Sequence, residues 1–481
     1  MTLEESRRRT LEGPLALAML RFGSPLALGM GLQVTFNLVD AYVVSRLGQN
    51  ESSAALGAIG ICDQVAAIGS IISYGLSTAA ATVTSHRFGA GDLLGARKVA
   101  WQSTILVALL GLAFGLLGLF GAHWMMGDLV GAKGRVLTLG TEYLRVIMGG
   151  NVTIFLLLHW TTLQRAMGSS KTPVAFVLLS NALNFVLAVL LVYGPGRAPE
   201  IFAWGPELAR ALAIPRLGLV GAAWATLLAR VVVLLPLFVI LIRRFGLFTA
   251  QVRGPLEKEL VSTLGGLAWP ASVQLVVRIL VMLLVQSLVA RLYTTADDQS
   301  ATTALGIVFR LETMALFISL GWGSAAQTFV GQNLGARHEH RAVKSGWLAA
   351  AYNSAMMALL ATIYVVMGRS IVEFFDRDPE VVRLGINYLH VVTFSYIGLG
   401  VGIVLGSALQ SAGLPRLALA IDGAVLTCVL VPALALVSSM KLPVTSIWLA
   451  VAASYCAFAL VYAIVYAKRG LFKSDHLTTG N

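Results

Sequence analysis

The sequence predicts an all-α integral membrane protein whose twelve transmembrane helices form two six-helix lobes, related by an internal parallel repeat. Three observations support this fold class. The 481 residues are 57% hydrophobic and only 12% charged, with a mean hydropathy of +0.80, whereas about a quarter of an ordinary soluble domain is charged. The apolar residues form long continuous runs, and the second half of the chain repeats the first.

Each apolar run has the length of a membrane span, which takes about 20 residues when it is helical. A membrane β-barrel would show short segments of alternating polarity instead. Polar residues break the runs at regular intervals. In chain order, the predicted spans are 22–45, 54–86, 95–123, 137–166, 172–194, 217–242, 260–290, 299–332, 342–367, 384–411, 416–438 and 444–467.

The two halves of the chain are copies of each other. Segment 75–98 shares eight identical residues with segment 321–344 at a shift of 246. Similar shifts align LQRAMG with LQSAGL, YLRV with YLHV, and Pro25 with Pro270. Because each repeat holds an even number of spans, both halves insert the same way up, about an axis along the membrane normal.

The repeat and the positive charges divide the chain into five predicted parts. They are a cytoplasmic N-terminal segment at 1–21, an N-terminal lobe at 22–245, a cytoplasmic linker at 246–259, a C-terminal lobe at 260–468 and a cytoplasmic tail at 469–481. More of the 35 lysines and arginines lie before the first span, in even-numbered loops and after the last span than in the odd-numbered loops. This excess marks the cytoplasmic side.

The net charge of +12 is explained by this sidedness and by anionic lipid headgroups. We expect a multi-pass protein of the plasma (inner) membrane, with the lipid bilayer and a small organic molecule as its partners. No basic stripe with interleaved aromatic residues points to nucleic acid. A monomer is sufficient, since one chain carries both halves.

The repeat and the buried charges favour a secondary transporter, because such proteins place their pathway between or within repeated halves. Asp40 is the first candidate for the coupling-ion site. It lies late in the first span, and its counterpart in the second repeat is Val285 or Gln286. A buried carboxylate suits reversible protonation and can also bind Na⁺. A structural hydrogen bond to a neighbouring helix is the alternative.

Asparagines of two spans are candidates for the same chamber. Asn181 and Asn184 are three residues apart and therefore share a helix face, and we assign them with Asp40 to the coupling-ion site. Asn37 lies one turn before Asp40 and is assigned to the substrate cavity. Hydrogen bonding between helices is an equally ordinary role for such amides.

The second half carries further polar candidates for the substrate cavity. Glu312 and Arg310 are two residues apart and so do not face each other on a helix. Charges within spans are costly, which makes both informative, although a structural ion pair would explain them as well. The other predicted cavity residues are Gln164, Gln274 and Arg278.

Enzymatic and cofactor chemistry find no support in the sequence. No nucleotide-binding loop, metalloprotease motif or nucleophile elbow is present. Cys62, Cys428 and Cys456 form no metal-binding pair. We therefore expect no enzyme activity, no cofactor and no structural metal, and we expect an ion gradient, H⁺ or Na⁺, to supply the energy.

Six segments carry a resemblance to a known family. They are VDAYVVSRLG in the first span, GLSTAAATVTSHRFGAGD after the second, LQRAMGSSKTP after the fourth, GLVGAAWATLLAR in the sixth, and GQNLGA and LGSALQSAGLP in the second half. Through these segments the chain resembles the multidrug and toxic compound extrusion family. The resemblance implies two six-helix lobes around a V-shaped cavity and cation-coupled export of drugs. It also implies that Asp40 is the coupling-ion residue and that Asn184 lies near it.

Three departures from the family pattern bear on the coupling ion. Ala188 stands where one branch of the family usually has an aspartate, and Arg278 stands where the sodium-coupled branch usually has a glutamate. The tenth predicted span also has no acid where that sodium-coupled branch has an aspartate. These departures favour protons over sodium and place coupling at Asp40. Arg278 would also disfavour a purely cationic substrate if it faces the cavity.

The predicted mechanism is alternating access. A cation taken up at Asp40 from outside would shift the helices of the first lobe and displace substrate outward, which requires unequal affinities in the two states. The main rival is a flippase of lipid-linked or polyanionic substrates from the same superfamily. A membrane-embedded enzyme is a more distant rival, because the candidate acids and histidines are scattered along the chain.

Overall fold

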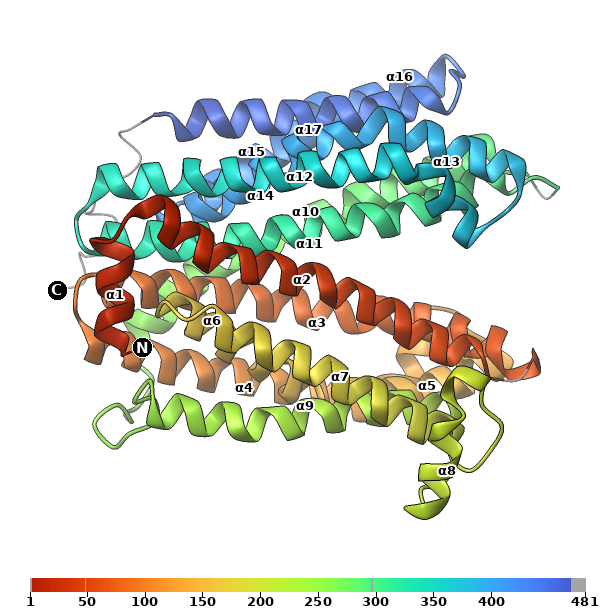
Figure 1. The fold of residues 1–481 in the computed structure, drawn as a ribbon, viewed down its shortest axis with the longest axis horizontal. Helices are drawn as coiled ribbons and strands as arrows, with labels where there is room; N and C mark the ends of the chain where they lie inside the picture. Colours follow the sequence, from red (N-terminus) through yellow and green to blue (C-terminus); the bar gives the residue numbers. More distant parts are fainter. Residues whose placement is uncertain (1, 48, 296, 469–481) are drawn as a thin grey trace.

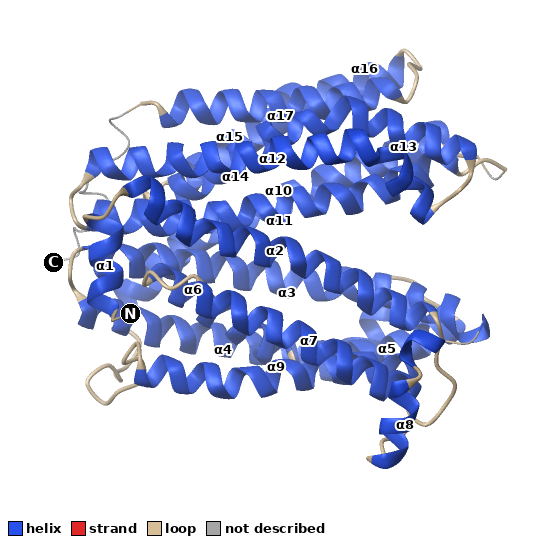
Figure 2. Ribbon diagram, viewed as in Figure 1, coloured by secondary structure: helices blue, strands red, loops and turns tan. Residues whose placement is uncertain are grey.

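The computed structural model describes residues 2–47, 49–295 and 297–468, and for residues 35–41 and 49–53 it describes the main chain alone. Every regular element in these ranges is helical, as Figure 2 shows. A helix satisfies its own main-chain N–H and C=O groups, for which lipid offers no partner. The predicted all-α fold class is thereby confirmed.

The first lobe consists of long apolar helices joined by short turns. The helices are α2 (Leu15–Ser45), α3 (Gln49–Gly89), α4 (Leu93–Trp124), α5 (Gly134–Gly149), α6 (Asn151–Ala166), α7 (Lys171–Tyr193) and α9 (Gly218–Arg243). Helix α2 begins seven residues before the predicted start of the first span, because Arg21 is exposed and does not interrupt the helix.

The second lobe repeats this arrangement with kinks in two spans. Its helices are α10 (Lys258–Tyr293), α11 (Ser300–Gly335), α12 (Glu339–Phe375), α13 (Pro379–Val392), α14 (Tyr396–Ser411), α15 (Pro415–Val425), α16 (Val431–Ser439) and α17 (Thr445–Tyr466). A 3-10 turn, η3 (Thr393–Ser395), joins α13 to α14, and a π-helical turn, η4 (Leu426–Leu430), joins α15 to α16.

Four short helices lie outside the long spans or extend one of them. Helix α1 (Leu3–Leu11) lies within the predicted N-terminal segment, and α8 (Trp204–Ala211) lies with the 3-10 turn η2 (Glu200–Phe202) between α7 and α9. The π-helical turn η1 (Met125–Leu129) continues α4. The sequence analysis predicted none of them, because short amphipathic helices give no long apolar run.

The structure confirms the predicted number of spans once one broken span is recognised. Eleven helical segments of the described chain are long and apolar enough to cross a membrane. The twelfth is the pair α5 and α6, which differ in direction by 44°. The break lies at Gly149 and Gly150, where the α-helical geometry is interrupted at Gly150.

The two lobes meet through glycines that the internal repeat relates. A Cβ atom on Gly89 of α3 would lie 2.0 Å from the main-chain oxygen of Gln332 in α11. A Cβ atom on Gly335 of α11 would lie 1.9 Å from the main-chain oxygen of His86 in α3. The shift of 246 that relates Gly89 to Gly335 also relates His86 to Gln332, so this contact has pseudo-twofold symmetry.

A second pair of glycines repeats the same symmetry deeper between the lobes. A Cβ on Gly75 of α3 would lie 2.0 Å from the hydroxyl of Ser272 in α10, and one on Gly321 of α11 would lie 2.4 Å from the Cα of Ala27 in α2. Ala27 and Ser272 correspond at a shift of 245. Both helix pairs approach this closely because the glycine in each pair has no side chain.

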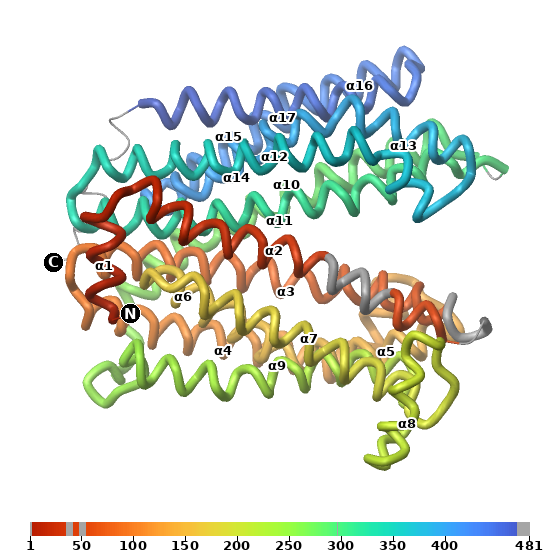
Figure 3. Tube along the Cα trace, in the orientation of Figure 1, coloured from red at the N-terminus to blue at the C-terminus, as the bar shows by residue number. Residues whose placement is uncertain are grey.

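The lobes are joined at one end and spread apart at the other. In Figures 1 and 3 they approach each other at the end that carries α1 and diverge toward the opposite end. Hydrogen bonds hold the joined end. The ring Nε2 of His86 donates to the main-chain oxygen of Ser411 at 2.7 Å, and the amide of Gln332 donates to that of Ala166 at 2.8 Å.

Helix α1 lies across this joined end and contacts both lobes (Figure 1). The guanidinium of Arg7 donates to the main-chain oxygen of Gly89 at 3.0 Å. On the other side, the guanidinium of Arg341 in α12 donates to the main-chain oxygen of Thr10 at 3.2 Å. Helix α1 therefore links the end of α3 to the start of α12.

Candidate functional site

A cavity of about 100 Å³ lies inside the C-terminal lobe, between α10, α11, α14, α15, η4 and α17. Its wall is mostly apolar, but it includes three ionisable residues, Arg278, Glu312 and Asp422. Charged groups within membrane spans are costly and therefore mark functional candidates. The cavity is the candidate site that the described side chains define best.

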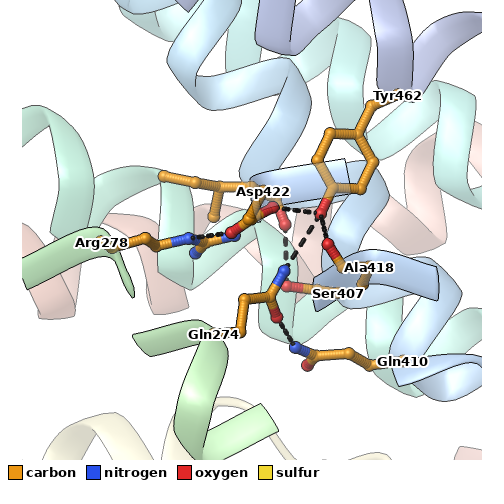
Figure 4. A network of polar contacts seen from close by, with 8 residues as sticks. Gln274, Arg278, Ser407, Gln410, Ala418, Asp422 and Tyr462 are labelled. Atoms are coloured by element: carbon orange, nitrogen blue, oxygen red, sulfur yellow. Dashed lines mark hydrogen bonds and ion pairs between the residues drawn. The ribbon is translucent and has the colours of Figure 1, made fainter. Parts of the chain in front are cut away.

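Arg278 and Asp422 form an ion pair at one wall of the cavity (Figure 4). The Nε of Arg278 lies 3.0 Å from Oδ2 of Asp422, and the side chains are 20% and 3% exposed, respectively. The guanidinium lies over the ring of Phe458, 5.7 Å from its centroid. The pair joins α10 to α15, although the two residues are 144 positions apart.

Hydrogen bonds from a chain of uncharged side chains fix the side of Asp422 that faces away from Arg278 (Figure 4). The hydroxyl of Tyr462 lies 2.5 Å from Oδ1 of Asp422 and 3.0 Å from the main-chain oxygen of Ala418. The amide of Gln274 donates to the Tyr462 hydroxyl at 3.0 Å. Gln410 in turn donates to the side-chain oxygen of Gln274. The network therefore spans α10, α14, α15 and α17.

Glu312 is held differently, by tyrosine hydroxyls. Tyr388 of α13 donates to Oε2 of Glu312 at 2.5 Å, and Tyr455 of α17 donates to Oε1. The Glu312 residue is 6% exposed. Among the ion pairs between described residues, none involves Glu312. The ring of Tyr388 packs edge-on against Trp448 with centroids 4.9 Å apart, which fixes its hydroxyl beside the carboxylate.

The π-helical turn η4 forms part of the cavity wall through Leu426 and Leu430. Such turns insert an extra residue into a helix and are frequent at functional sites. Pro432 follows at the start of α16 and has no main-chain N–H to donate. The last turns of this span are therefore free to deviate from regular α-helical bonding beside the cavity.

The structure brings three of the predicted cavity residues together and separates the others. Arg278 and Glu312 line the cavity, and Gln274 belongs to the network behind it. Arg310 is exposed and does not line this cavity, in agreement with its spacing from Glu312. Gln164 is fully buried in α6 of the other lobe, and its side-chain oxygen and nitrogen have no hydrogen-bond partner among the described residues.

The predicted coupling-ion site in the N-terminal lobe is described only in part. The side chains of Asp40 and Asn37 lie outside the described residues. Asn184 is buried in α7, and its side-chain oxygen accepts a hydrogen bond from Thr226 of α9 at 3.0 Å. Asn181 is half-buried, and its amide nitrogen has no partner within the described part of the chain.

Sequence reasoning missed the tyrosines that hold the two carboxylates. A signal was present, because Tyr455 and Tyr462 are seven residues apart on one face of an otherwise apolar span. In an apolar span a charged residue or an amide points to a site more strongly than a phenol does. Asp422 was not assigned to the site either, since nothing in the sequence connects it with Arg278.

The described residues hold no group of three or more histidine, cysteine, aspartate or glutamate side chains that could bind a metal ion. The three cysteines are free thiols; Cys62 is buried, and Cys428 and Cys456 are exposed. The chemistry available at the cavity is therefore ion pairing, hydrogen bonding and reversible protonation.

Comparisons with known proteins agree with this architecture. The family model MatE matches residues 25–190 and 270–435, one match in each repeat. The "Probable multidrug resistance protein YpnP" of Bacillus subtilis is 26% identical over 84% of both chains. The "FAD transporter" of Shewanella oneidensis is 25% identical over 94% of this chain and 96% of its own. "Multidrug export protein MepA" of Staphylococcus aureus is 24% identical over 96% of both chains.

Solved structures share the fold at low sequence identity. A transporter of the MOP superfamily from Pyrococcus furiosus superposes with a TM-score of 0.84 at 21% identity, over 97% of this chain and 98% of its own. A structure described as the outward-facing conformation of a multidrug resistance MATE family transporter also has a TM-score of 0.84 at 21% identity, over 96% and 98%. These likenesses establish the two-lobed fold.

Proposed function

This chain belongs to the MatE family, and we propose on that premise that it exports drugs or other organic compounds across the plasma membrane in exchange for a cation. Relatives named as multidrug resistance or multidrug export proteins cover most of both chains. The family consists of transporters, and the cavity of the C-terminal lobe offers binding groups without a metal cluster in the described residues.

Alternating access is the mechanism we propose, and one observation carries it. The lobes are sealed at the end that carries α1 by pseudo-twofold glycine contacts and diverge at the other end (Figure 1). A symmetric contact between two similar lobes can be broken at one end and replaced at the other by rocking the lobes. With both termini cytoplasmic, as the positive charges favour, this is the outward-facing state.

We place the coupling cation, a proton rather than sodium, at Asp40, with Asn181 and Asn184 beside it. The amide nitrogen of Asn181, which has no partner among the described residues, and the hydrogen-bonded Asn184 supply polar groups on α7 for such a site. Substrate would enter between the lobes, where Asn37, Gln164 and Arg310 remain candidate contacts in addition to the C-terminal cavity. One chain carries both lobes, so a monomer suffices.

A second candidate substrate class is an anionic dinucleotide. It is favoured by the relative named as an FAD transporter. FAD therefore belongs in any substrate panel beside the organic cations.

The test is transport by the purified protein in liposomes. We expect ethidium to move against its gradient when a proton gradient is imposed, and not when a sodium gradient alone is imposed. Sodium-driven export would overturn the choice of ion. Transport of FAD without transport of ethidium would favour the second substrate class.

The site at Asp40 is tested by replacing one carboxylate at a time. Asp40→Asn should abolish proton-driven export. Asp63→Asn is the matched control, since Asp63 is exposed on α3 of the same lobe, and it should leave export within about twofold of the parent. Normal ethidium–proton exchange by Asp40→Asn would overturn the assignment.

A further inference from the structure

We propose that the guanidinium of Arg278 is a resident cation that permanently occupies Asp422, so that Glu312 is the single carboxylate of the C-terminal cavity open to an exchangeable proton. The proposal rests on the transport function above and specifies how many charges this lobe exchanges. It concerns two carboxylates that line one cavity but have opposite surroundings.

Asp422 has both carboxylate oxygens occupied by protein groups. Oδ2 lies 3.0 Å from Nε of Arg278, and Oδ1 lies 2.5 Å from the Tyr462 hydroxyl. The side chain is 3% exposed. A mobile cation would have to displace the guanidinium, and a buried charge that loses its partner is strongly unfavourable.

The guanidinium is held so that it stays with Asp422. Its planar group lies over the ring of Phe458, and Phe458 packs edge-on against the ring of Tyr462 with centroids 4.9 Å apart. Gln274, on the same helix as Arg278, donates to the Tyr462 hydroxyl. The cation and its carboxylate belong to one network (Figure 4), and Phe458 supports the guanidinium and packs against Tyr462 of that network.

No cation among the described residues forms an ion pair with Glu312. Its hydrogen-bond donors are the neutral hydroxyls of Tyr388 and Tyr455. The Tyr364 hydroxyl bonds to the main chain of Leu311 beside it. The other charged groups on the cavity wall are Arg278 and Asp422 themselves.

The charge balance of the cavity follows from this arrangement. The pair of Arg278 and Asp422 contributes no net charge, and Glu312 contributes one negative charge when it is ionised. A buried carboxylate without a cation is costly, so a proton is favoured whenever the cavity is closed to water. The C-terminal lobe therefore exchanges one proton in a cycle, although it holds two carboxylates.

Thermal stability tests the resident cation without any transport assay. Removing the cation in Arg278→Ala should lower the melting temperature at pH 8 by about 5–10 °C, the size expected for breaking a buried ion pair from one side. Na⁺ or methylguanidinium at millimolar concentration should restore much of this loss, as should a fall in pH. N-Methyl-D-glucamine, which is too large for the cavity, controls for ionic strength.

Two further variants keep the test decisive. Arg278→Ala/Asp422→Asn should be more stable than Arg278→Ala and should not respond to Na⁺ or methylguanidinium, because no buried charge is left. Arg291→Ala, which removes an exposed arginine from the same helix as Arg278, should resemble the parent. If Arg278→Ala does not fold, the Arg278→Lys and double variants still permit the comparison. An unchanged melting temperature for Arg278→Ala, or an equal cation response in the double variant, would overturn the proposal.

Transport stoichiometry tests the part assigned to Glu312. The Glu312→Gln variant should exchange one proton fewer per ethidium than the parent. The Arg278→Ala variant should exchange one additional cation per ethidium. Equal stoichiometry in the parent and both variants would contradict the proposal. Failure of every variant and of the parent to transport would instead contradict the proposed function, while the stability measurements above would still decide the role of Arg278.

Discussion

Glycines decide how closely the two lobes approach at their sealed end. Gly89 and Gly335 place helix α3 against helix α11 so tightly that any Cβ would collide with a main-chain oxygen of the other lobe. Main-chain atoms cannot move aside as the tip of a flexible side chain can. These two residues are therefore the points at which the sealed state is most sensitive to substitution.

Gly335→Ala should open the sealed end. The added methyl group would lie 1.9 Å from the main-chain oxygen of His86, so the helices must separate. Spin labels on the ends of α3 and α11 should show a longer distance than in the parent. Gly306→Ala on the same helix is the control, since nothing lies within 4 Å of its added Cβ. An unchanged distance in Gly335→Ala would contradict the prediction.

The buried hydroxyl of Tyr462 connects Asp422 to Gln274 and should contribute to stability. Tyr462→Phe removes this hydroxyl without changing the ring, and we expect a loss of about 1.5–3 kcal/mol, the range for a hydrogen bond to a charged group. Tyr466→Phe on the same helix removes a hydroxyl that lies 3.4 Å from a main-chain oxygen and should cost less. Thermal unfolding of both variants measures the difference, and equal losses would argue against the network.

At the scale of an element, helix α1 links the two lobes across the sealed end. Its first turn is well capped, because Thr2 and Glu5 bond reciprocally in a capping box. Ser6 donates to the main-chain oxygen of Gly168 at 2.8 Å, and Arg341 reaches the other side of the helix. Separation of the lobes at this end must break one set of these contacts.

Loss of the α1 contacts should destabilise the sealed end. Arg7→Ala removes both hydrogen bonds to the main-chain oxygen of Gly89 and should increase the labelling of a cysteine placed in the contact between α3 and α11. Arg8→Ala is the matched control on the same helix, since Arg8 is 79% exposed and pairs with Glu12 at the surface. Such surface pairs contribute little. Equal labelling of the two variants would show that α1 does not hold the lobes together.

At the scale of the whole molecule, the repeat explains both the closeness and the reversibility of the contact between lobes. Gly75 and Gly321 face Ser272 and Ala27, which the repeat also relates. Two similar surfaces that meet around a pseudo-twofold axis can part and rejoin as rigid bodies. The π-helical turn η4 and the bend between α5 and α6 are the irregular points within otherwise rigid spans.

A covalent bond across the sealed end should stop transport. In a variant whose three native cysteines are replaced, Ser85→Cys and Gly331→Cys join α3 to α11. The Cβ of Ser85 would lie 2.9 Å from a Cβ at Gly331, somewhat closer than the roughly 3.8 Å of a disulfide, so a small shift suffices. Oxidation should abolish export and reduction should restore it. Undiminished export after complete oxidation would contradict alternating access, and each single cysteine variant serves as control.

Sequence alone determined the class of the protein, the number of spans and the repeat. These properties depend on local hydrophobicity and on residues that recur at a fixed shift, such as Gly89 and Gly335. It also identified Arg278 and Glu312 as costly charges within spans. It did not connect Arg278 with Asp422, or Glu312 with Tyr388 and Tyr455.

Only the tertiary structure decided those partnerships. In a long apolar helix every face is similarly hydrophobic, so the sequence does not state which face meets which neighbour. Arg310 and Glu312 illustrate this, because they are two residues apart and yet one is exposed and the other buried. The packing of α10, α11, α15 and α17 brought one carboxylate to an arginine and the other to tyrosines. Charge pairing inside a membrane protein depends on how helices rotate against each other, and that rotation is a property of the assembled lobe.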